Sequence, residues 1–293
     1  MSAARRGSAV RLLAAALGLL ALAGCARSAK SPDVTADRPG TPVDSATVAL
    51  WRMDETGGTR VADAGPSRLD ATAGLDTRTI FGRFRGARLF THSIDSFLYV
   101  PYSPLLDLQS ALTIEAWIAP NDLPAAPSPI TARWSASTGD RSWVFALLNG
   151  LGIGAAITPD WLQGTVASTG QIGHLTFVYQ PEDAGAPRAF YSLSGIELQR
   201  WTHVAVTFDS HFVCFYVDGQ PDGTFATSGR IRASAAPLLV GNFFDARFLT
   251  EFGGDLRQGP AAETATWYSL DGGIDELRIS NVARTQFPLH GGR

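Results

Sequence analysis

Short runs of alternating apolar and polar residues dominate this sequence. In the run Leu112–Ala119, the apolar side chains at even positions share one side, opposite Thr113, Glu115 and Trp117. A period of two residues is that of a β-strand, in which successive side chains point to opposite faces of the sheet. The spacing of three and four residues that marks an amphipathic helix is nearly absent. The pattern therefore predicts an all-β protein.

The predicted strands are short, and clusters of Gly, Pro, Asp and Ser separate them. Asp218-Gly219 follows one run directly and indicates a hairpin turn, because such a turn needs positive φ at both positions. Many short strands with short links favour two packed antiparallel sheets, a β-sandwich of the jelly-roll kind. The runs are Thr47–Met53, Arg88–Phe90, Phe97–Val100, Leu112–Ala119, Trp143–Leu148, Gly154–Ile157, Leu175–Tyr179, Trp201–Phe208, Phe212–Val217, Leu238–Val240 and Ile274–Ile279.

Two longer stretches interrupt this rhythm. Asn121–Gly139 is rich in Pro and Ser, and Phe244–Asp271 is long and carries Trp267 among several charged residues. Long ordered loops are where binding residues usually lie. We therefore expect a ligand site, if there is one, to involve these stretches.

The N-terminus has the pattern of an export signal. A basic segment precedes the apolar run Leu12–Ala23, which is shorter than the ~20 residues of a membrane-spanning helix. The run ends in Leu22-Ala23-Gly24-Cys25, which resembles the lipobox of bacterial lipoproteins. This resemblance implies cleavage before Cys25, acylation of its thiol, and a membrane anchor. The alternative is an ordinary secretory signal that ends near a cysteine.

These signals divide the chain into four parts: a signal peptide (1–24), a lipidated cysteine with a flexible linker (25–45), the β domain (46–284) and a C-terminal tail (285–293). The linker is rich in Ser, Pro, Asp, Thr and Gly, and buries too little to offset its ordering entropy. Ala26 stands where Asp tends to retain Gram-negative lipoproteins in the inner membrane. We therefore expect secretion through the inner membrane and anchoring in the outer membrane or at the cell surface.

The charge balance excludes one class of partner. Removing residues 1–24 takes away three arginines and no acid, which leaves 21 basic and 27 acidic residues and a net charge of −6. A nucleic-acid-binding protein needs a basic face against the phosphates, so we expect no nucleic-acid partner. The sequence has two cysteines. If Cys25 carries lipid, Cys214 has no partner within the chain and is a buried strand residue without a disulfide.

Five segments have a characteristic composition and order: Ala49–Asp63, Leu112–Pro120, Trp201–Asp209, Phe215–Gly219 and Gly273–Ile279. They resemble the opening strand, the central strand, the paired hairpin strands and the closing strand of laminin G-like domains, which belong to the concanavalin A-like lectin/glucanase group. The resemblance implies a concanavalin A-like jelly roll. It does not select a function, because this fold carries lectins, adhesion modules, glycosidases and structural domains.

The same resemblance shows where hydrolytic residues would lie. Retaining glycosidases of this fold are similar in a strand motif, Glu-x-Asp-x-x-Glu, and their mechanism needs two carboxyl groups ~5 Å apart. Glu115 in the central strand has no acid two residues later, so we interpret it as structural and predict that the protein is not an enzyme. The five histidines never fall at metal-ligand spacing, which argues against zinc.

Calcium is the candidate cofactor. Several domains of the group hold one Ca²⁺ where the first and last strands meet, with an Asp of the closing strand as a ligand. The resemblance implies that Asp275 takes this role, and Asp54, after the opening strand, is expected close by. Carbonyl groups and water would complete the six to eight oxygens. Alternatively, the two residues cap strands or pair with Arg52 and Arg278.

Aromatic residues in or beside loops are the candidate ligand-binding residues, because sugars stack on exposed rings. The set is Trp134, Trp161, Phe243, Trp267 and Tyr268. For each one, packing in the core is the competing explanation. The sequence thus favours a membrane-anchored lipoprotein whose laminin G-like domain binds a carbohydrate or a cell-surface protein. A structural module of the cell envelope and a divergent glycoside hydrolase are the alternatives.

Overall fold

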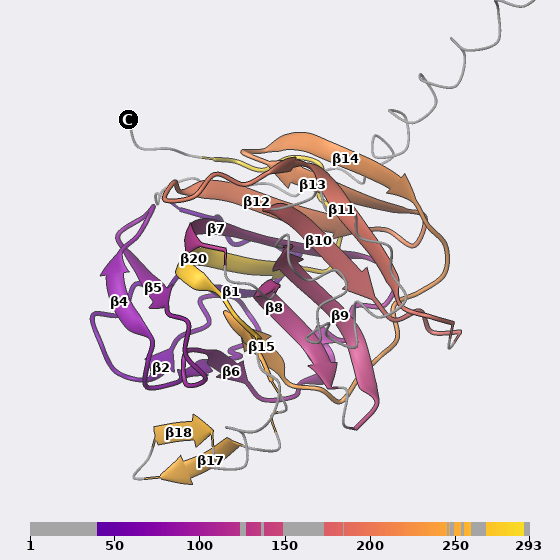
Figure 1. Cartoon of the computed structure of the whole chain (residues 1–293). Coiled ribbons are helices and arrows are strands. Elements are labelled where there is room, and N and C mark those ends of the chain that lie inside the picture. The colour runs from indigo at the N-terminus through magenta and orange to yellow at the C-terminus, as the bar shows by residue number, and fades with distance from the viewer. Residues whose placement is uncertain are drawn as a thin grey trace, which may run out of the picture.

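The computed structural model is a sandwich of two antiparallel β-sheets (Figure 1). This confirms the predicted all-β jelly-roll fold. The structure describes residues 40–123, 127–135, 138–148, 173–183, 185–244, 246, 249–252, 255–258 and 268–289. The expected strand Gly154–Ile157 and residues 1–39, with Cys25, lie outside the described residues. Within the described residues, no helix is long and apolar enough to cross a membrane.

The first sheet is built around the predicted central and closing strands, β7 and β20, which pair side by side. β1 (Thr47–Trp51) also pairs with β20, in addition to the strands in the linear order given next. The order of the other strands is β14 (Gln220–Ala226), β13 (Phe212–Val217), β12 (Thr202–Phe208), β7 (Leu112–Asp122), β20 (Asp271–Ser280), β5 (Gly86–Phe90) and β4 (Arg78–Phe81).

The second sheet packs against the first. Its strand order is β11 (Arg188–Gly195), β10 (His174–Tyr179), β9 (Asp140–Leu147), β8 (Ser128–Ser135), β15 (Leu238–Val240), β6 (Leu98–Val100), β3 (Ala71–Ala73) and β2 (Arg60–Val61). Two small ribbons are separate from it, β16 (Asn242–Phe243) with β19 (Tyr268–Ser269), and β17 (Leu249–Phe252) with β18 (Asp255–Gln258). One 3-10 helix, Pro104–Leu106, lies in the described part of the chain.

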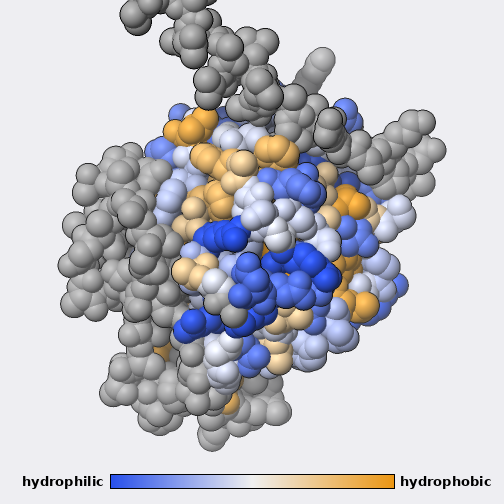
Figure 2. All heavy atoms as spheres, turned by 90° about the vertical axis from the view of Figure 1, so that its right-hand side faces the viewer, coloured by the Kyte–Doolittle hydropathy of each residue, from blue (hydrophilic) through white to orange (hydrophobic). Residues whose placement is uncertain are grey.

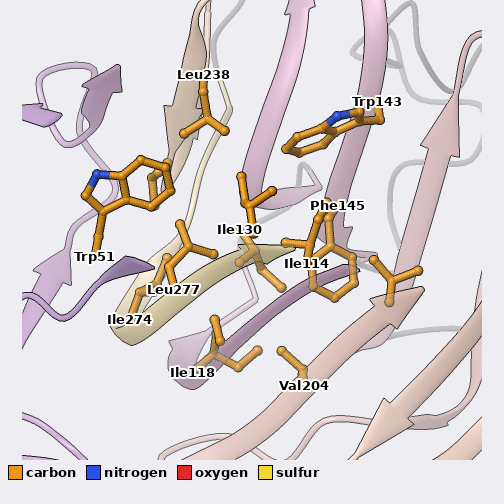
Figure 3. Close-up of a cluster of buried hydrophobic side chains, with 14 of the residues drawn as sticks. Trp51, Ile114, Ile118, Ile130, Trp143, Phe145, Val204, Leu238, Ile274 and Leu277 are labelled. Atoms are coloured by element: carbon orange, nitrogen blue, oxygen red, sulfur yellow. The ribbon is translucent and has the colours of Figure 1, made fainter. Parts of the chain in front are cut away.

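The alternation seen in the sequence decides which side chains enter the core between the sheets. Ile114 and Ile118 of β7 lie there with Val204 of β12, opposite Trp143 and Phe145 of β9 (Figure 3). The intervening residues of each strand point to the outer face of its sheet. Burial of this large apolar surface is the main stabilising contribution to the fold.

Both stretches expected to be long loops contain strands, and Phe244–Asp271 includes β17, β18 and β19. Asn121–Gly139 was expected to be irregular, but it contains β8, in which all eight residues are buried. The strand could not be seen in the sequence because its alternation of apolar and polar residues is interrupted. Its pairing with β9 shifts register between Pro129 and Thr131 and again between Arg133 and Trp134. A bulge reverses which face the following residues share, so a strict period of two fails there. The predicted hairpin turn is confirmed, with φ of 47° at Asp218 and 72° at Gly219.

Both ends of the described chain pack on the outer face of the first sheet. Asn281 N donates to Ala46 O at 3.0 Å, and Arg284 Nη2 lies 2.6 Å from Asp44 Oδ1. Phe287 packs on Tyr216 with ring centroids 4.8 Å apart. The last residues of the expected flexible linker and the first residues of the expected tail therefore belong to the packed structure.

Cys214 also lies on this outer face, 3 % exposed in β13. It is disulfide-bonded, and the described residues contain no free cysteine. The expectation that Cys214 forms no disulfide is therefore wrong. Cys25 is the other cysteine of the sequence. A bond within the chain would consequently use the thiol that the lipobox resemblance assigns to lipid.

Candidate functional site

A buried charge cluster occupies the centre of the first sheet's outer face. It comprises Glu115 of β7, His203 of β12 and Arg278 of β20, whose strands are neighbours. Arg278 Nε donates to Glu115 Oε1 at 2.7 Å, and His203 Nε2 is 3.2 Å from Glu115 Oε2. Arg284 adds a second arginine, with Nε 3.8 Å from Glu115 Oε1. Alternation places Glu115, His203 and Arg278 together, because each is flanked along its strand by residues that enter the core.

The cations keep Glu115 ionised. Burial alone would raise the pKa of Glu115, which is 2 % exposed, but Arg278, His203 and Arg284 lower it to about 2. A general acid must carry a proton near neutral pH, and a nucleophile must reach its substrate. Glu115 does neither, since it is ion-paired and covered. This supports the interpretation of Glu115 as a structural residue.

Asp275, the predicted calcium ligand, lies on the same outer face at the end nearest the β4–β5 turn. Its Oδ2 accepts from Phe84 N at 2.8 Å and also from the Arg83 amide. Its Oδ1 is buried and has no hydrogen-bond partner. Burial, with Glu276 and Asp54 as like charges, raises the pKa of Asp275 to about 8, although the two amides oppose the shift. The carboxyl group therefore lacks a cation or a proton donor at Oδ1.

Asp54, the second predicted ligand, lies at the base of the same turn. Its Oδ1 accepts from Gly86 N at 3.1 Å, and its charge acts on Asp275. The alternative pairing with arginines does not occur, because Arg52 Nη1 binds Glu276 Oε2 at 2.9 Å and Arg278 binds Glu115. The structure thus brings the two predicted ligands into electrostatic contact.

The donors around Asp275 fit calcium in kind but are few. The described residues contain no group of three or more His, Cys, Asp or Glu side chains placed for a metal. Backbone oxygen is available, since Asp275 Oδ2 and Gly86 O both lie against Gly82, leaving no room for a side chain there. Ca²⁺ accepts such carbonyl and carboxylate oxygens with water. Asp275 Oδ1 is the atom that would gain most from an ion.

The predicted aromatic set gathers on the outer face of the second sheet. Trp134 of β8, Phe243 of β16 and Tyr268 of β19 join Val144, Ala146 and Val178 in one apolar cluster. Phe243 and Tyr268 are in direct contact, with ring centroids 5.9 Å apart. The structure brings these three residues together, although they come from distant segments. Trp161 and Trp267 lie outside the described residues.

These three rings are not exposed, contrary to the expectation for loop residues. Trp134 is 2 % exposed, and Phe243 and Tyr268 are also buried. The physical reason is local, because each belongs to a strand rather than a loop and faces its neighbours in the cluster. We correct their assignment from ligand contact to packing. A ring that stacks on a sugar must present a face to solvent.

Two exposed aromatic residues escaped the sequence analysis. Tyr102 is 48 % exposed and follows β6, and Phe81 is 95 % exposed at the end of β4. Tyr102 has polar neighbours, since its hydroxyl donates to Asp107 Oδ2 at 3.3 Å and the Arg133 guanidinium lies 6.0 Å from its ring centroid. The Pro-Tyr-Ser-Pro sequence around Tyr102 was the available signal, because proline on both sides favours an exposed turn.

The side of the sandwich shown in Figure 2 is mostly polar. Hydrophilic side chains fill the centre of its coloured surface, and apolar residues occur in small separate groups. The side that faces the viewer in Figure 2 is the right-hand side of the molecule in Figure 1. The described part of this side therefore offers hydrogen-bonding groups rather than an extended apolar patch.

The sequence of strands and the jelly-roll topology agree with a family comparison. Residues 92–287 match the family model of the concanavalin A-like lectin/glucanases superfamily. The chain belongs to this superfamily. The match spans the strands from β6 to β20 and the packed C-terminal segment, and it confirms the laminin G-like resemblance. No curated protein matches the sequence.

Solved structures with the same fold include the binding domains of protein toxins. The binding domain of Paraclostridial Mosquitocidal Protein 1 has a TM-score of 0.53 at 11 % identity, and the match covers 80 % of this chain and 48 % of that one. A botulinum neurotoxin type C structure has a TM-score of 0.52 at 12 % identity, covering 82 % and 48 %. The chain thus spans about half the length of these domains. At such identities the likeness establishes the fold alone.

Proposed function

We propose that the protein is a lipid-anchored binding module of the cell envelope that recognises carbohydrate. The superfamily supports a lectin-like domain. Two neighbours in fold have glycan-containing ligands: the type C neurotoxin interacts with two ganglioside molecules, and a serotype D ligand-binding domain forms a complex with N-acetylneuraminic acid. The lipobox-like sequence ending in Cys25 supports the anchor.

The state of Glu115 is the observation that favours binding over hydrolysis. It is the acid of the central strand, and its salt bridge to Arg278, at 2.6 Å, holds it buried and ionised. A retaining glycosidase needs one carboxylic acid and one carboxylate facing the same bond. Glu115 instead serves as the counter-ion of the buried Arg278.

Tyr102 is the described residue best suited to contact a sugar. Its ring is half exposed and lies beside the carboxylate of Asp107, which is 19 % exposed, above the fully buried guanidinium of Arg133. Sugar recognition combines such a ring with groups that bind hydroxyls. Trp161 and Trp267 stay candidates from the sequence.

A glycan array with the purified, non-acylated chain tests this proposal. We expect a defined set of glycans to be bound, and Tyr102→Ala to lower the affinity by about 1–3 kcal/mol, as loss of an aromatic anchor does. Phe81→Ala is the matched control, since it removes an exposed ring elsewhere. Trp161→Ala and Trp267→Ala test the other two candidates. A cell-surface protein partner is supported if no glycan binds.

Hydrolysis is tested in parallel by incubating the protein with polysaccharides and measuring new reducing ends. We expect none above background. Release by the wild type that Glu115→Gln abolishes, while both proteins remain folded, would overturn the binding proposal in favour of a glycoside hydrolase.

A further inference from the structure

The β4–β5 hairpin presents an aromatic side chain on a rigid tip. Phe81 is the last residue of β4 and is almost entirely exposed. The turn behind it is held firmly, because Gly82 N donates to Arg85 O at 2.9 Å and Phe84 N donates to Asp275 Oδ2 at 2.8 Å. β4 is also the edge strand of the first sheet. The ring is therefore held outward by ordered backbone.

The hairpin that carries this ring is positively charged. From Arg78 to Gly86 the hairpin carries Arg78, Arg83 and Arg85 and no acidic residue. Among the described residues, none of these arginines forms an ion pair; Arg83 instead lies over the Trp117 ring, 4.8 Å from its centroid. The charged groups that face the hairpin from below are Asp54, at the amide of Gly86, and the buried Asp275. The exposed surface of the tip is thus cationic and aromatic.

The first described residue, Gly40, lies on the side of the domain that carries this hairpin, so the proposed anchor would join the domain there. Gly40 lies against the side chains of Glu276 and Arg52, and the residue before Glu276 is Asp275, which binds the hairpin turn. Fifteen peptide links separate Gly40 from Cys25. The composition of this segment predicts a flexible chain, which at that length would span about 20 Å on average, whereas a domain of this size is about 45 Å across. The hairpin side therefore stays closer to the anchor than the opposite side does.

We propose that the tip of the β4–β5 hairpin docks on the anionic bilayer surface that carries the anchor, with Phe81 among the headgroups and the arginines against lipid phosphates. The inference rests on the proposed membrane anchoring for its proximity. Both kinds of side chain suit a membrane surface. Aromatic rings lie at the boundary between headgroups and acyl chains, and arginines bind anionic lipid headgroups. A sugar site is less well matched, because ligand sites are concave and this ring projects from a convex tip.

The test measures the depth of position 81 in the full acylated protein. Phe81→Cys and, as a control, Leu193→Cys are labelled with an environment-sensitive fluorophore; Leu193 is 69 % exposed in β11 of the other sheet. An acylated Cys25 cannot bond to Cys214, but Cys214 is only 3 % exposed, and the parent protein gives the background labelling. The proteins are reconstituted in vesicles of phosphatidylcholine with or without phosphatidylglycerol. Flotation of the vesicles reports the anchor separately.

We expect the label at position 81 to shift to shorter wavelength in phosphatidylglycerol vesicles, and the label at position 193 to stay unchanged. Arg78→Gln with Arg85→Gln should lower the docked fraction, by about fivefold in the equilibrium for each arginine. Equal responses at both positions in floating vesicles would overturn the docking proposal while leaving the anchor intact. A shift caused by a soluble sulfated polysaccharide but not by vesicles would overturn it in favour of an acidic glycan. Failure to float would refute the anchor, and with it this docking.

Discussion

The two outer faces of the sandwich are buried by opposite means. On the first sheet, Glu115, Arg278 and Arg284 form a charge cluster that both chain ends cover. On the second sheet, Trp134 lies in an apolar cluster with Phe243 and Tyr268. Buried ions attract each other strongly but lose their hydration, whereas apolar side chains gain directly from leaving water. The stability of the first face therefore depends on each buried charge having a partner. The stability of the second face depends on how well the apolar side chains fill the space.

Removing the anion of the charge cluster should have the largest effect. Glu115→Gln leaves the fully buried Arg278 without its counter-ion, which typically destabilises by about 4 kcal/mol. Urea unfolding measures the change. Glu115→Gln combined with Arg278→Met is the control, because removing both charges should recover part of the loss. A loss below about 1 kcal/mol for the single variant would show that the pair contributes little.

The same cluster makes the first face sensitive to acid. The folded-state pKa of Glu115 is about 2, well below its ordinary 4.5. Its stabilising contribution is therefore complete above pH ~4.5 and is lost as the pH falls toward ~2. Asp44, whose pKa Arg284 likewise lowers to about 2 against the effect of burial, adds to this loss. The Glu115→Gln variant should show a shallower decline of unfolding free energy with acid than the wild type.

Trp134→Ala tests the apolar face. The side chain is 2 % exposed, so its truncation leaves a cavity and should cost about 3 kcal/mol of unfolding free energy. Unlike the loss at Glu115, this one should not change between pH 3 and pH 7, since no charge is removed. Chemical unfolding at both pH values measures it. A stable Trp134→Ala variant with weakened glycan binding would restore Trp134 to the ligand site.

The fold was predictable because alternation and turn residues are local signals. Ile114 and Ile118 point to the core as their spacing indicates, and Asp218-Gly219 forms its turn. The cluster around Glu115 was not predictable, because it depends on which strands are neighbours: β7 lies between β12 and β20, which are far apart in the sequence. Trp134 shows the converse, since its strand was hidden by the irregular register of β8 and its ring was assigned to a loop.

Calcium binding at Asp275 should have a smaller effect that depends on pH. Without metal, the raised pKa of Asp275, about 8, means that the folded state holds a proton that the unfolded state has released. Stability should therefore fall as the pH rises from ~4 to ~8. Calcium at 100 times its dissociation constant should restore about 2.7 kcal/mol at pH 8. Thermal unfolding with calcium or chelator measures this.

Asp275→Asn is the matched control for the calcium prediction. It keeps an oxygen for the Phe84 amide but removes the charge, so its stability should depend less on pH and should not respond to calcium. A wild type that unfolds at the same temperature with calcium and with chelator, after exchange has been allowed, would contradict the site.

Cys25→Ser should change stability least. The variant distinguishes acylation of the Cys25 thiol from a disulfide bond with Cys214. If Cys25 is acylated, the substitution abolishes incorporation of a fatty-acid probe and leaves the melting temperature unchanged, because the acylated thiol forms no bond to Cys214. If Cys25 instead forms the disulfide of Cys214, the substitution removes a bond that closes a long loop beneath the covered face. Loss of such a bond typically costs 2–5 kcal/mol.

Cys214→Ser is the control, since it should match Cys25→Ser in stability only in the second case. Metabolic labelling together with thermal unfolding of both variants decides, and equal labelling of wild type and Cys25→Ser would refute the lipid anchor.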